Sequence, residues 1–366
     1  MDPAELRRHN LLRDGQTMAT GQVYRDGVDL PALLDNACRH ADYARRRRQY
    51  TGENEKHPYL RRGIGMSTFF HGAGFTGSGE TWLASEVHVE GRPDGIVEVL
   101  TASTDMGQGA QTVLTQIAAD ALGLSEECVA VAVPDTSRVP NSGPTVASRT
   151  TMIVGRLVAD ACRELAAIVG AHGAALPEAI RVWHQAYPGQ RLLGKAQYET
   201  PKDIRWDDKT YRGDAYAYYA WAAHIADVEV DLRTFTVQVK DYVALQEVGK
   251  VIHPTLATGQ IQGGVVQGIG WALMEEVVLQ DGAMKNSQFT NYVIPTAADL
   301  PPIRVFFQEQ PAPYGPGGAK GIGELPMDGP APAILNAVCH ALGTNLTRVP
   351  LTPEYLLAHL EGQADG

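Results

Sequence analysis

The sequence predicts an α+β fold in which mixed sheets and helices form two subdomains. Strand-like segments on either side of a turn signal indicate β-hairpins at 84–102 and at 225–244. Two polar, glycine-containing loops, at 104–112 and 140–151, each run into a helix-like segment. The residue pattern changes abruptly twice along the chain. We therefore expect three parts, an N-terminal helical and linker segment and two subdomains, at 1–62, 63–223 and 224–366.

The composition is that of an ordinary soluble globular protein. The chain has 366 residues, of which 44% are hydrophobic and 20% charged, and its net charge is −11. This negative balance argues against nucleic acid as the main partner, because only a local basic run could offset phosphate repulsion. That run is Arg45–Arg48. We expect it to be a solvated helix face or a docking patch for an acidic partner subunit.

The cysteines and the N-terminus predict a cytoplasmic protein. The four cysteines are dispersed and show neither CxxC nor His/Cys ligand spacing. This argues against structural zinc or an iron–sulfur cluster within the chain and favours buried thiols in a reducing compartment. The N-terminal residues 1–8 lack an apolar signal core, and no stretch approaches the length of a membrane span. We expect no contact with a membrane.

The first hundred residues are predicted to be helical and then β. A helix is expected over Leu30–Tyr50. A short apolar strand within 63–80 then runs into a glycine-rich loop that carries Phe75 and Thr76. The hairpin that follows is expected to have its strands at 84–90 and 95–102, joined across Arg-Pro-Asp-Gly.

The loop after this hairpin is a candidate anion site. Thr104–Thr112 opens a helix that reaches about Leu122, and backbone N–H groups at such a turn face the helix N-terminus, often toward an anion. The loop is not a Walker A motif, because no Gly-Lys-Ser/Thr follows it. It does not fit the dinucleotide GxGxxG spacing either.

A second unit of the same kind follows. A strand at 129–133 leads into the polar loop 140–151, which runs into an amphipathic helix containing Val154, Val158, Cys162 and Leu165 at helical spacing. Ser148, Thr150 and Thr151 could be simple helix caps. Together with Arg149, the same hydroxyls would suit a phosphate or a polar ring edge.

The C-terminal half contains a helix with unusual composition. The expected helix 254–278 carries five glycines, at 259, 263, 264, 268 and 270. These should cost a free helix several kcal/mol, at about 1 kcal/mol each relative to alanine. Such a helix survives only if it packs closely against backbone or a ligand. We therefore expect Gln260, Gln262 and Gln267 to project into a crowded place. Further helices are expected at 177–186 and 331–342, and a strand at 303–309.

The loop after that last strand holds one carboxylate, Glu324, among five glycines and two prolines. Prolines fix φ and glycines allow positive φ and close backbone approach, so the loop can be compact and irregular. A carboxylate held in such a loop beside a ligand is a candidate general base. The alternative is a tight turn with an ordinary surface glutamate.

Four motifs occur in order along the chain: Met106-Gly-Gln-Gly109, Pro144–Thr151, Gly259–Gly268 and Gly321-Ile-Gly-Glu324. Together they resemble the molybdopterin-binding subunit of the xanthine dehydrogenase/aldehyde oxidase family of molybdenum hydroxylases. The resemblance covers essentially the whole chain. It implies the mixed-sheet molybdopterin-binding fold of that family and a molybdopterin cofactor with molybdenum. Whether the cofactor has the cytosine dinucleotide form is left open.

The resemblance also assigns site residues. Glu324 matches the family's base, which deprotonates the equatorial Mo–OH, and Gln267 matches a glutamine near the apical oxo group. Gly107, Gln108 and Gly109 match a loop that hydrogen-bonds the pterin. The segment around the dithiolene and phosphate end of the cofactor is matched by Ala147, Ser148, Arg149, Thr150 and Thr151. No side chain is implied as a metal ligand, because the pterin dithiolene holds the molybdenum.

The substrate is indicated by Phe75-Thr76, which lies where purine-oxidising members carry a Phe-Thr pair. There the ring would stack on a heterocycle and the hydroxyl would meet a polar edge. The alternative is a core phenylalanine beside a glycine loop. The resemblance favours hydroxylation of a xanthine-like or hypoxanthine-like purine at an electrophilic ring carbon, with water as oxygen source. A nicotinate, other N-heterocycle or aldehyde hydroxylase is the alternative, and a non-catalytic assembly subunit is the second.

One departure from the family concerns the upstream half of the subunit. The Gly-Gly-x-Phe-Gly cofactor loop and the substrate-orienting Arg or Glu of that half are not found in this sequence. The chain therefore resembles the C-terminal half of a split molybdenum subunit. The expected partners are the other half, a [2Fe–2S] subunit and an FAD subunit, in an obligate hetero-oligomer that is inactive without them.

Overall fold

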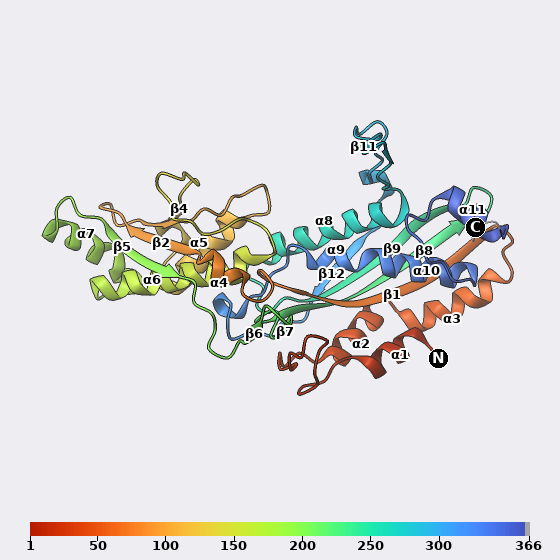
Figure 1. Ribbon diagram of the computed structural model, residues 1–366, viewed down its shortest axis with the longest axis horizontal. Coiled ribbons are helices and arrows are strands. Elements are labelled where there is room, and N and C mark those ends of the chain that lie inside the picture. The colour runs from red at the N-terminus through yellow and green to blue at the C-terminus, as the bar shows by residue number, and fades with distance from the viewer. Residues whose placement is uncertain (363–366) are drawn as a thin grey trace.

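The computed structural model describes residues 1–362. They form two lobes that follow one another along the long axis of the molecule (Figure 1). Each lobe is built on one four-stranded sheet with helices packed against it. Both sheets contain parallel and antiparallel pairs. The expected α+β class with mixed sheets is therefore confirmed.

The larger lobe contains the sheet β1-β8-β9-β12, in which β12 runs parallel to β9 and the other pairs are antiparallel. Its strands are β1 (Leu60–Gly72), β8 (Tyr219–Asp231), β9 (Thr236–Glu247) and β12 (Ile303–Phe307). Within residues 1–362 the helices of this lobe are α1 (Pro3–Asn10), α2 (Leu30–His40), α3 (Tyr43–Asn54), α8 (Pro254–Leu273), α9 (Leu325–Asp328), α10 (Pro330–Leu342) and α11 (Pro353–Leu360).

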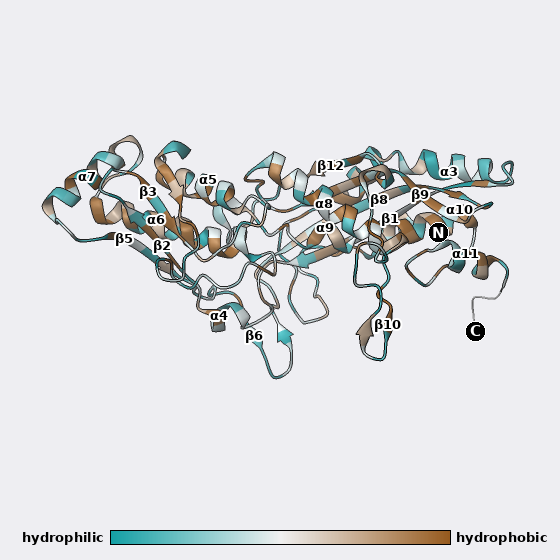
Figure 2. Ribbon diagram, turned by 90° about the horizontal axis from the view of Figure 1, so that it is seen from above, coloured by the Kyte–Doolittle hydropathy of each residue, from teal (hydrophilic) through white to brown (hydrophobic). Residues whose placement is uncertain are grey.

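Both faces of the larger sheet are covered by helices. Successive side chains of each strand point to opposite faces, so neighbouring residues enter different cores. Ile225 packs with α1, α2 and α3 in one apolar core. Its neighbour Ala226 packs with α8 and α10 in another. In Figure 2, helix α3 is mainly hydrophilic on the outside of this arrangement.

The smaller lobe contains the sheet β4-β3-β2-β5, with strands β2 (Glu86–Gly91), β3 (Val97–Leu100), β4 (Val129–Val131) and β5 (Leu192–Gln197). Its helices are α4 (Gly79–Leu83), α5 (Ala110–Leu122), α6 (Gly155–Val169) and α7 (Leu176–Ala186). The predicted β2–β3 hairpin is present. Strand β4 returns parallel to β3 after α5, so the first predicted anion loop lies between a strand and a crossover helix.

The lobes do not follow the subdomain boundaries predicted at 62/63 and 223/224. Strand β1 pairs along its whole length with β8, from Leu60↔Asp231 to Gly72↔Tyr219. Residues 60–72 and 219–223 therefore belong to the larger sheet. The strand is also longer than predicted, because its glycines serve packing: a Cβ on Gly65 would lie 2.1 Å from the backbone nitrogen of Ala337 in α10.

The predicted helix 30–50 is wrong as one helix. It is divided into α2 and α3, and Asp42 between them adopts a left-handed conformation with φ 50°. Helix α3 also continues past the predicted end, to Asn54. The short helix α4 lies in the stretch that was predicted to be loop.

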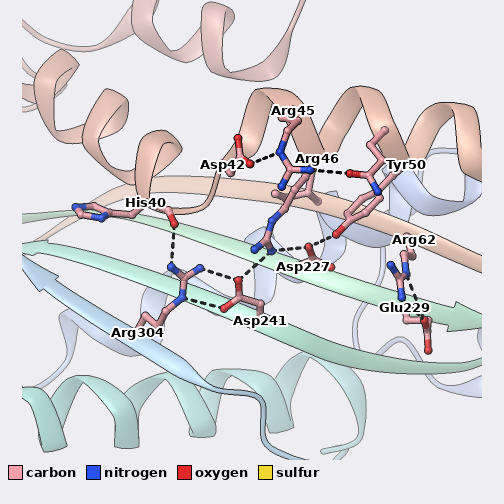
Figure 3. Close-up of polar contacts among 12 residues, drawn as sticks. His40, Asp42, Arg45, Arg46, Tyr50, Arg62, Asp227, Glu229, Asp241 and Arg304 are labelled. Atoms are coloured by element: carbon pink, nitrogen blue, oxygen red, sulfur yellow. Dashed lines mark hydrogen bonds and ion pairs between the residues drawn. The ribbon is translucent and has the colours of Figure 1, made fainter.

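The basic run on α3 is used mainly within the chain (Figure 3). Arg46 lies 2.9 Å from carboxylate oxygens of Asp227 on β8 and Asp241 on β9, and Arg304 of β12 shares Asp241. Arg45 pairs with Asp42, and Arg47 with Asp2. The Arg46 pairs attach α3 to the sheet, the Arg47 pair connects it to the residue before α1, and the Arg45 pair is local. Three of the four arginines therefore already have acidic partners within the chain.

The glycine-rich helix α8 ends at Leu273, five residues before the predicted end. The chain then forms a projecting arm with the hairpin β10 (Leu279–Gln280) and β11 (Ala283–Met284) (Figure 1). The expected close packing is found at three of the five glycines: an added Cβ would lie within 3 Å of another atom at Gly264, Gly268 and Gly270.

We expect Gly268→Ala to lower the free energy of unfolding by about 1–3 kcal/mol, because the new Cβ would lie 2.6 Å from Cγ of Pro330 in α10. The control is Gly263→Ala on the same helix, where an added Cβ meets nothing within 4 Å. That control should gain up to about 1 kcal/mol from helix propensity. Urea denaturation of the two variants measures the difference, and equal midpoints would contradict the packing explanation.

The small hairpin β6 (Trp206–Asp207) and β7 (Arg212–Gly213) lies in the region that had no clear pattern. Within residues 1–362, no helix is long and apolar enough to cross a bilayer. The same residues contain no cluster of three His, Cys, Asp or Glu side chains that could hold a metal ion.

Candidate active site

A cavity of about 430 Å³ lies where the two lobes meet. It is lined by the start of α5, the loop 145–151, the first two turns of α8 and the loop 319–324. Its volume is within the usual range for a small-molecule or cofactor pocket. The four predicted motifs thus contribute to one site, although they are spread over more than half of the sequence.

The positive ends of helix dipoles are directed at this cavity. Helix α5 begins at Ala110, α8 begins at Pro254, and α6 is preceded by a π-helical turn at Thr150–Val154; residues at each of these starts line the cavity. Unsatisfied N–H groups at such helix starts favour an anionic ligand. The site therefore suits a negatively charged molecule.

The first predicted loop is present, but part of its hydrogen bonding is satisfied internally. The carboxylate of Asp105 accepts hydrogen bonds from the N–H groups of Gly107, Gly109 and Gln111. These bonds hold the pKa of Asp105 below its ordinary value. The Gln108 side chain lines the cavity while its amide bonds to Met106 and Thr104 of its own loop.

The second predicted loop has a strained backbone. Ala147 and Ser148 have φ of 54° and 51°, a region that residues other than glycine rarely adopt. The loop is held by a hydrogen bond from the Gly74 N–H to the Ala147 carbonyl, 2.8 Å long. It also packs against Gly321, where a Cβ would lie 2.3 Å from the Ser148 carbonyl oxygen. Only glycine at 321 lets the two loops approach this closely.

Hydroxyl and amide groups supply donors on the cavity wall. Thr150, Thr151 and Gln260 line it, and their side chains make no hydrogen bond within residues 1–362. They are therefore available to a ligand with several acceptor atoms. Gln260 lies in the second turn of α8 and was not among the predicted cofactor residues.

Arg149 lines the cavity, but its guanidinium is engaged in a buried ion pair. Its Nε and Nη2 donate to the two oxygens of Glu80, at 2.8 and 2.7 Å, and neither side chain is more than 4% exposed. Nη2 also bonds to Ser85, and Nη1 to the Ser142 carbonyl. Glu80 in turn accepts from the N–H of Phe75. Arg149 thus fixes the loop that carries Ser148, and this geometry leaves its guanidinium little capacity for a phosphate.

Glu324 lies at the cavity wall as the residue before α9. Its Oε2 accepts a 2.7 Å hydrogen bond from Ser148 Oγ, and its own N–H donates to the same hydroxyl at 3.0 Å. His71 Nε2 lies 3.3 Å from Oε2, and His71 Nδ1 lies 2.9 Å from Asp328. The hydrogen bond with Asp328 is the main reason that the pKa of His71 is raised from its ordinary value. The Glu324 side chain is 51% exposed and is open to a ligand.

Five of the predicted site residues do not line this cavity. Gly107 and Gly109 are two of them, although Met106 and Gln108 of the same loop do line it. Gln267 is exposed on α8, two turns after Gln260, and does not line it. Phe75 is only partly buried and also lies away from it. Thr76 lines a second cavity of about 420 Å³, where its hydroxyl lies 2.5 Å from that of Tyr216. This second cavity is largely aromatic, with Phe70, Trp206, Tyr211, Tyr216 and Tyr219 in its wall.

His71, Asp328, Glu80 and Gln260 were not predicted as site residues. Asp328 follows Glu324 by four residues, the spacing at which side chains on one helical turn meet, so the sequence contained a usable signal for it. Gln260 lies within the motif Gly259–Gly268, so a signal for it was also present. The contacts of His71 and Glu80 depend on pairing between distant strands and loops, for which the sequence offered no signal.

The cavity lies at several helix starts and presents hydroxyl and amide donors and one exposed carboxylate. These features are those of a domain that holds an anionic cofactor with many acceptor atoms. Such a cofactor fits these residues, because the hydroxyls of Thr150 and Thr151 and the amide of Gln260 can donate hydrogen bonds to its acceptor atoms.

Comparison with known proteins identifies the family of this cofactor-binding domain. A family model described as a molybdopterin cofactor-binding domain matches residues 36–301. The aldehyde oxidoreductase of Megalodesulfovibrio gigas is 30% identical over 99% of this chain and 39% of that protein. The putative xanthine dehydrogenase molybdenum-binding subunit XdhA of Escherichia coli is 28% identical over 99% of this chain and 50% of the relative. The solved structure of quinoline 2-oxidoreductase from Pseudomonas putida has a TM-score of 0.82 at 27% identity, over 99% of this chain and 50% of the other.

The chain belongs to the xanthine dehydrogenase/aldehyde oxidoreductase family of molybdenum oxidoreductases, of which it forms a molybdopterin cofactor-binding domain. The family recognised from the four motifs is thereby confirmed. The chain spans half or less of the length of these curated relatives.

Proposed function

We propose that this chain binds molybdopterin and supplies the general base of a molybdenum hydroxylase that acts on a flat N-heterocycle. The observation that carries the proposal is the position of Glu324, whose carboxylate is anchored through Oε2 at the wall of the cofactor cavity. When bound, the cofactor would supply the redox centre that accepts two electrons from the substrate.

The residues of this chain divide the remaining work. Thr150, Thr151 and Gln260 donate hydrogen bonds to the cofactor, and the helix starts of α6 and α8 offset its negative charge. The family resemblance gave the glutamine contact with the cofactor to Gln267. We propose Gln260 for this contact instead, because Gln260 lines the cavity. Glu324 removes a proton from the attacking oxygen at its second carboxylate atom, Oε1.

A dinucleotide form of the cofactor is the finer proposal. A cavity of about 550 Å³ shares Lys250, Val251 and Ile252 with the first, and Arg156 and Arg163 contribute to its wall. The wall also contains Asp120 and Glu126, and both arginines pair with Asp160. Two arginines and Lys250 in one extension would still suit a diphosphate and a nucleotide beyond the pterin. This continuity supports the cytosine dinucleotide form.

For the substrate we propose a purine of the xanthine type. The aromatic cavity that contains Thr76 supports a flat ring system, and His71 forms a wall of this cavity while it contacts Glu324. The names of the relatives refer to an aldehyde, to xanthine and to quinoline, so they favour no one substrate. A nicotinate-like N-heterocycle and an aldehyde are the alternatives to be tested.

The active site is proposed to be completed by the half of the molybdenum subunit that this chain does not span, with [2Fe–2S] and FAD on partner subunits. Met106 and Val146 support this, because they line the cavity and are 73% and 50% exposed. The projecting arm between α8 and β12 also exposes large apolar residues, Val277, Val278, Leu279, Phe289, Val293 and Ile294. Several exposed large apolar side chains on one projecting segment are typical of an interaction site. The free cysteines of the described residues support a cytoplasmic location.

The proposal predicts that the complete complex, with both halves of the molybdenum subunit and the electron-transfer subunits, contains molybdopterin. We expect it to oxidise xanthine or hypoxanthine faster than nicotinate or a benzaldehyde, and to incorporate ¹⁸O from labelled water. The full chain without the other half should show no turnover. A complete complex without molybdopterin would favour a non-catalytic assembly role, and faster turnover of nicotinate or the aldehyde would reassign the substrate.

A further inference from the structure

His71 connects the proposed base to a second carboxylate. It lies near the end of β1, while Glu324 immediately precedes α9 and Asp328 is the last residue of that helix. Its Nδ1 is 2.9 Å from Asp328 Oδ2, and its Nε2 is 3.3 Å from Glu324 Oε2. One ring therefore bridges two carboxylates of a single helical turn.

Both contacts to the Glu324 carboxylate are made by the same oxygen. Ser148 Oγ and His71 Nε2 both approach Oε2, and Oε1 has no hydrogen bond within the described residues. Resting on the function proposed above, we propose that His71, oriented by Asp328, is a positioning residue that holds Glu324 through Oε2 and leaves Oε1 to accept the proton of the attacking oxygen.

The charge on His71 should control this arrangement. The titratable groups in contact with the ring are Glu324, which precedes α9, and Asp328, its last residue. Tyr216 and Tyr219 line the same aromatic cavity as His71. Asp328 raises the pKa of His71 above its ordinary value of 6.5, with Glu324 adding to the effect. Below that raised pKa the imidazolium donates to both carboxylates.

Above the raised pKa, one ring N–H is lost. The Asp328 carboxylate can only accept, so the remaining proton stays on Nδ1. The Nε2 lone pair then faces the lone pairs of Oε2, and Glu324 loses this donor. The contacts of protonated His71 also stabilise the folded state. This contribution is fully present below the unfolded-state pKa of histidine and is lost as pH rises through the raised folded-state pKa. Catalysis should therefore have an alkaline limb set by His71.

Three substitutions in the complete complex separate this role from simple packing. His71→Gln places an amide donor near the position of Nε2, so kcat at neutral pH should stay within a few-fold of wild type while the alkaline limb disappears. His71→Asn retains a group near Nδ1 but removes the donor to Glu324, so kcat should fall about ten-fold at every pH below the limb. Asp328→Asn should move the limb to lower pH, because it removes the main cause of the raised pKa.

The control is His88→Gln, which removes another histidine–carboxylate contact, with Glu86 on β2, outside the two cavities. Its pH profile should match wild type. A limb that persists in His71→Gln, or an Asp328→Asn variant that loses kcat equally at all pH values, would overturn the positioning role.

A second measurement does not depend on turnover. In the full chain with ¹³C-labelled histidine, the ring signal absent from His71→Gln should titrate above 6.5. It should titrate lower in Asp328→Asn and in Glu324→Gln. If these shifts are absent while the wild-type complex is active, the positioning proposal fails and the proposed function stands. If the shifts are present but the complete complex hydroxylates nothing, the proposed function fails, and the positioning of a general base by His71 fails with it.

Discussion

Glu324→Gln in the complete complex is expected to lower kcat by about 10²–10⁴-fold, the contribution typical of a positioned general base. Glutamine keeps the shape of the side chain and an acceptor for Ser148, but it cannot take a proton at neutral pH. The molybdopterin content should be unchanged, because the groups assigned to the cofactor, Thr150, Thr151 and Gln260, remain in place. Turnover and cofactor content would be measured on the same preparation.

The matched control for this substitution is Glu178→Gln on α7, an exposed glutamate in the smaller lobe. It should leave kcat and cofactor content unaltered. Unchanged turnover in Glu324→Gln would remove the catalytic assignment. Loss of the cofactor together with turnover would instead give Glu324 a role in holding the site together, since its N–H and carboxylate both bond to Ser148.

The sequence was informative where function depends on local backbone geometry. Glycine-rich or polar loops before helices were recognisable as cofactor loops, and they do line one cavity. The glycines of α8 predicted close packing, which is present at Gly264, Gly268 and Gly270. Such signals are local, because a residue's φ, its helix propensity and its capping preference are properties of a few neighbouring positions.

The sequence was uninformative where the site depends on contacts between distant segments. His71 and Asp328 are 257 residues apart in the chain, and their contact follows from the position of β1 beside α9. The same limit applies to Gln267 and Gln260: both fit a helix that faces a crowded site, and only the three-dimensional arrangement shows which one reaches the cavity. Arg149 was assigned to the cofactor through the resemblance of its motif to the family, and its buried partner Glu80 could not be inferred.

Arg149→Met is expected to lower the free energy of unfolding by about 3–5 kcal/mol, because it leaves the buried carboxylate of Glu80 without its partner. Arg149→Lys should not restore the loss, since a lysine cannot donate to both oxygens of Glu80 and also reach Ser85 and the Ser142 carbonyl. Urea denaturation of the full chain measures the change. The control is Arg181→Met, which breaks an exposed pair with Glu178 and should cost no more than about 1 kcal/mol.

The double variant Arg149→Met/Glu80→Leu distinguishes a structural ion pair from a cofactor contact. Removing both charges leaves neither one buried and unpaired, so most of the stability lost in the single variant should return. If Arg149 acts only by fixing the loop of Ser148, the refolded double variant should also recover molybdopterin binding to the extent that it recovers stability. If stability returns while the cofactor stays absent, the guanidinium contacts the cofactor directly, and Arg149 regains the role first suggested by its motif.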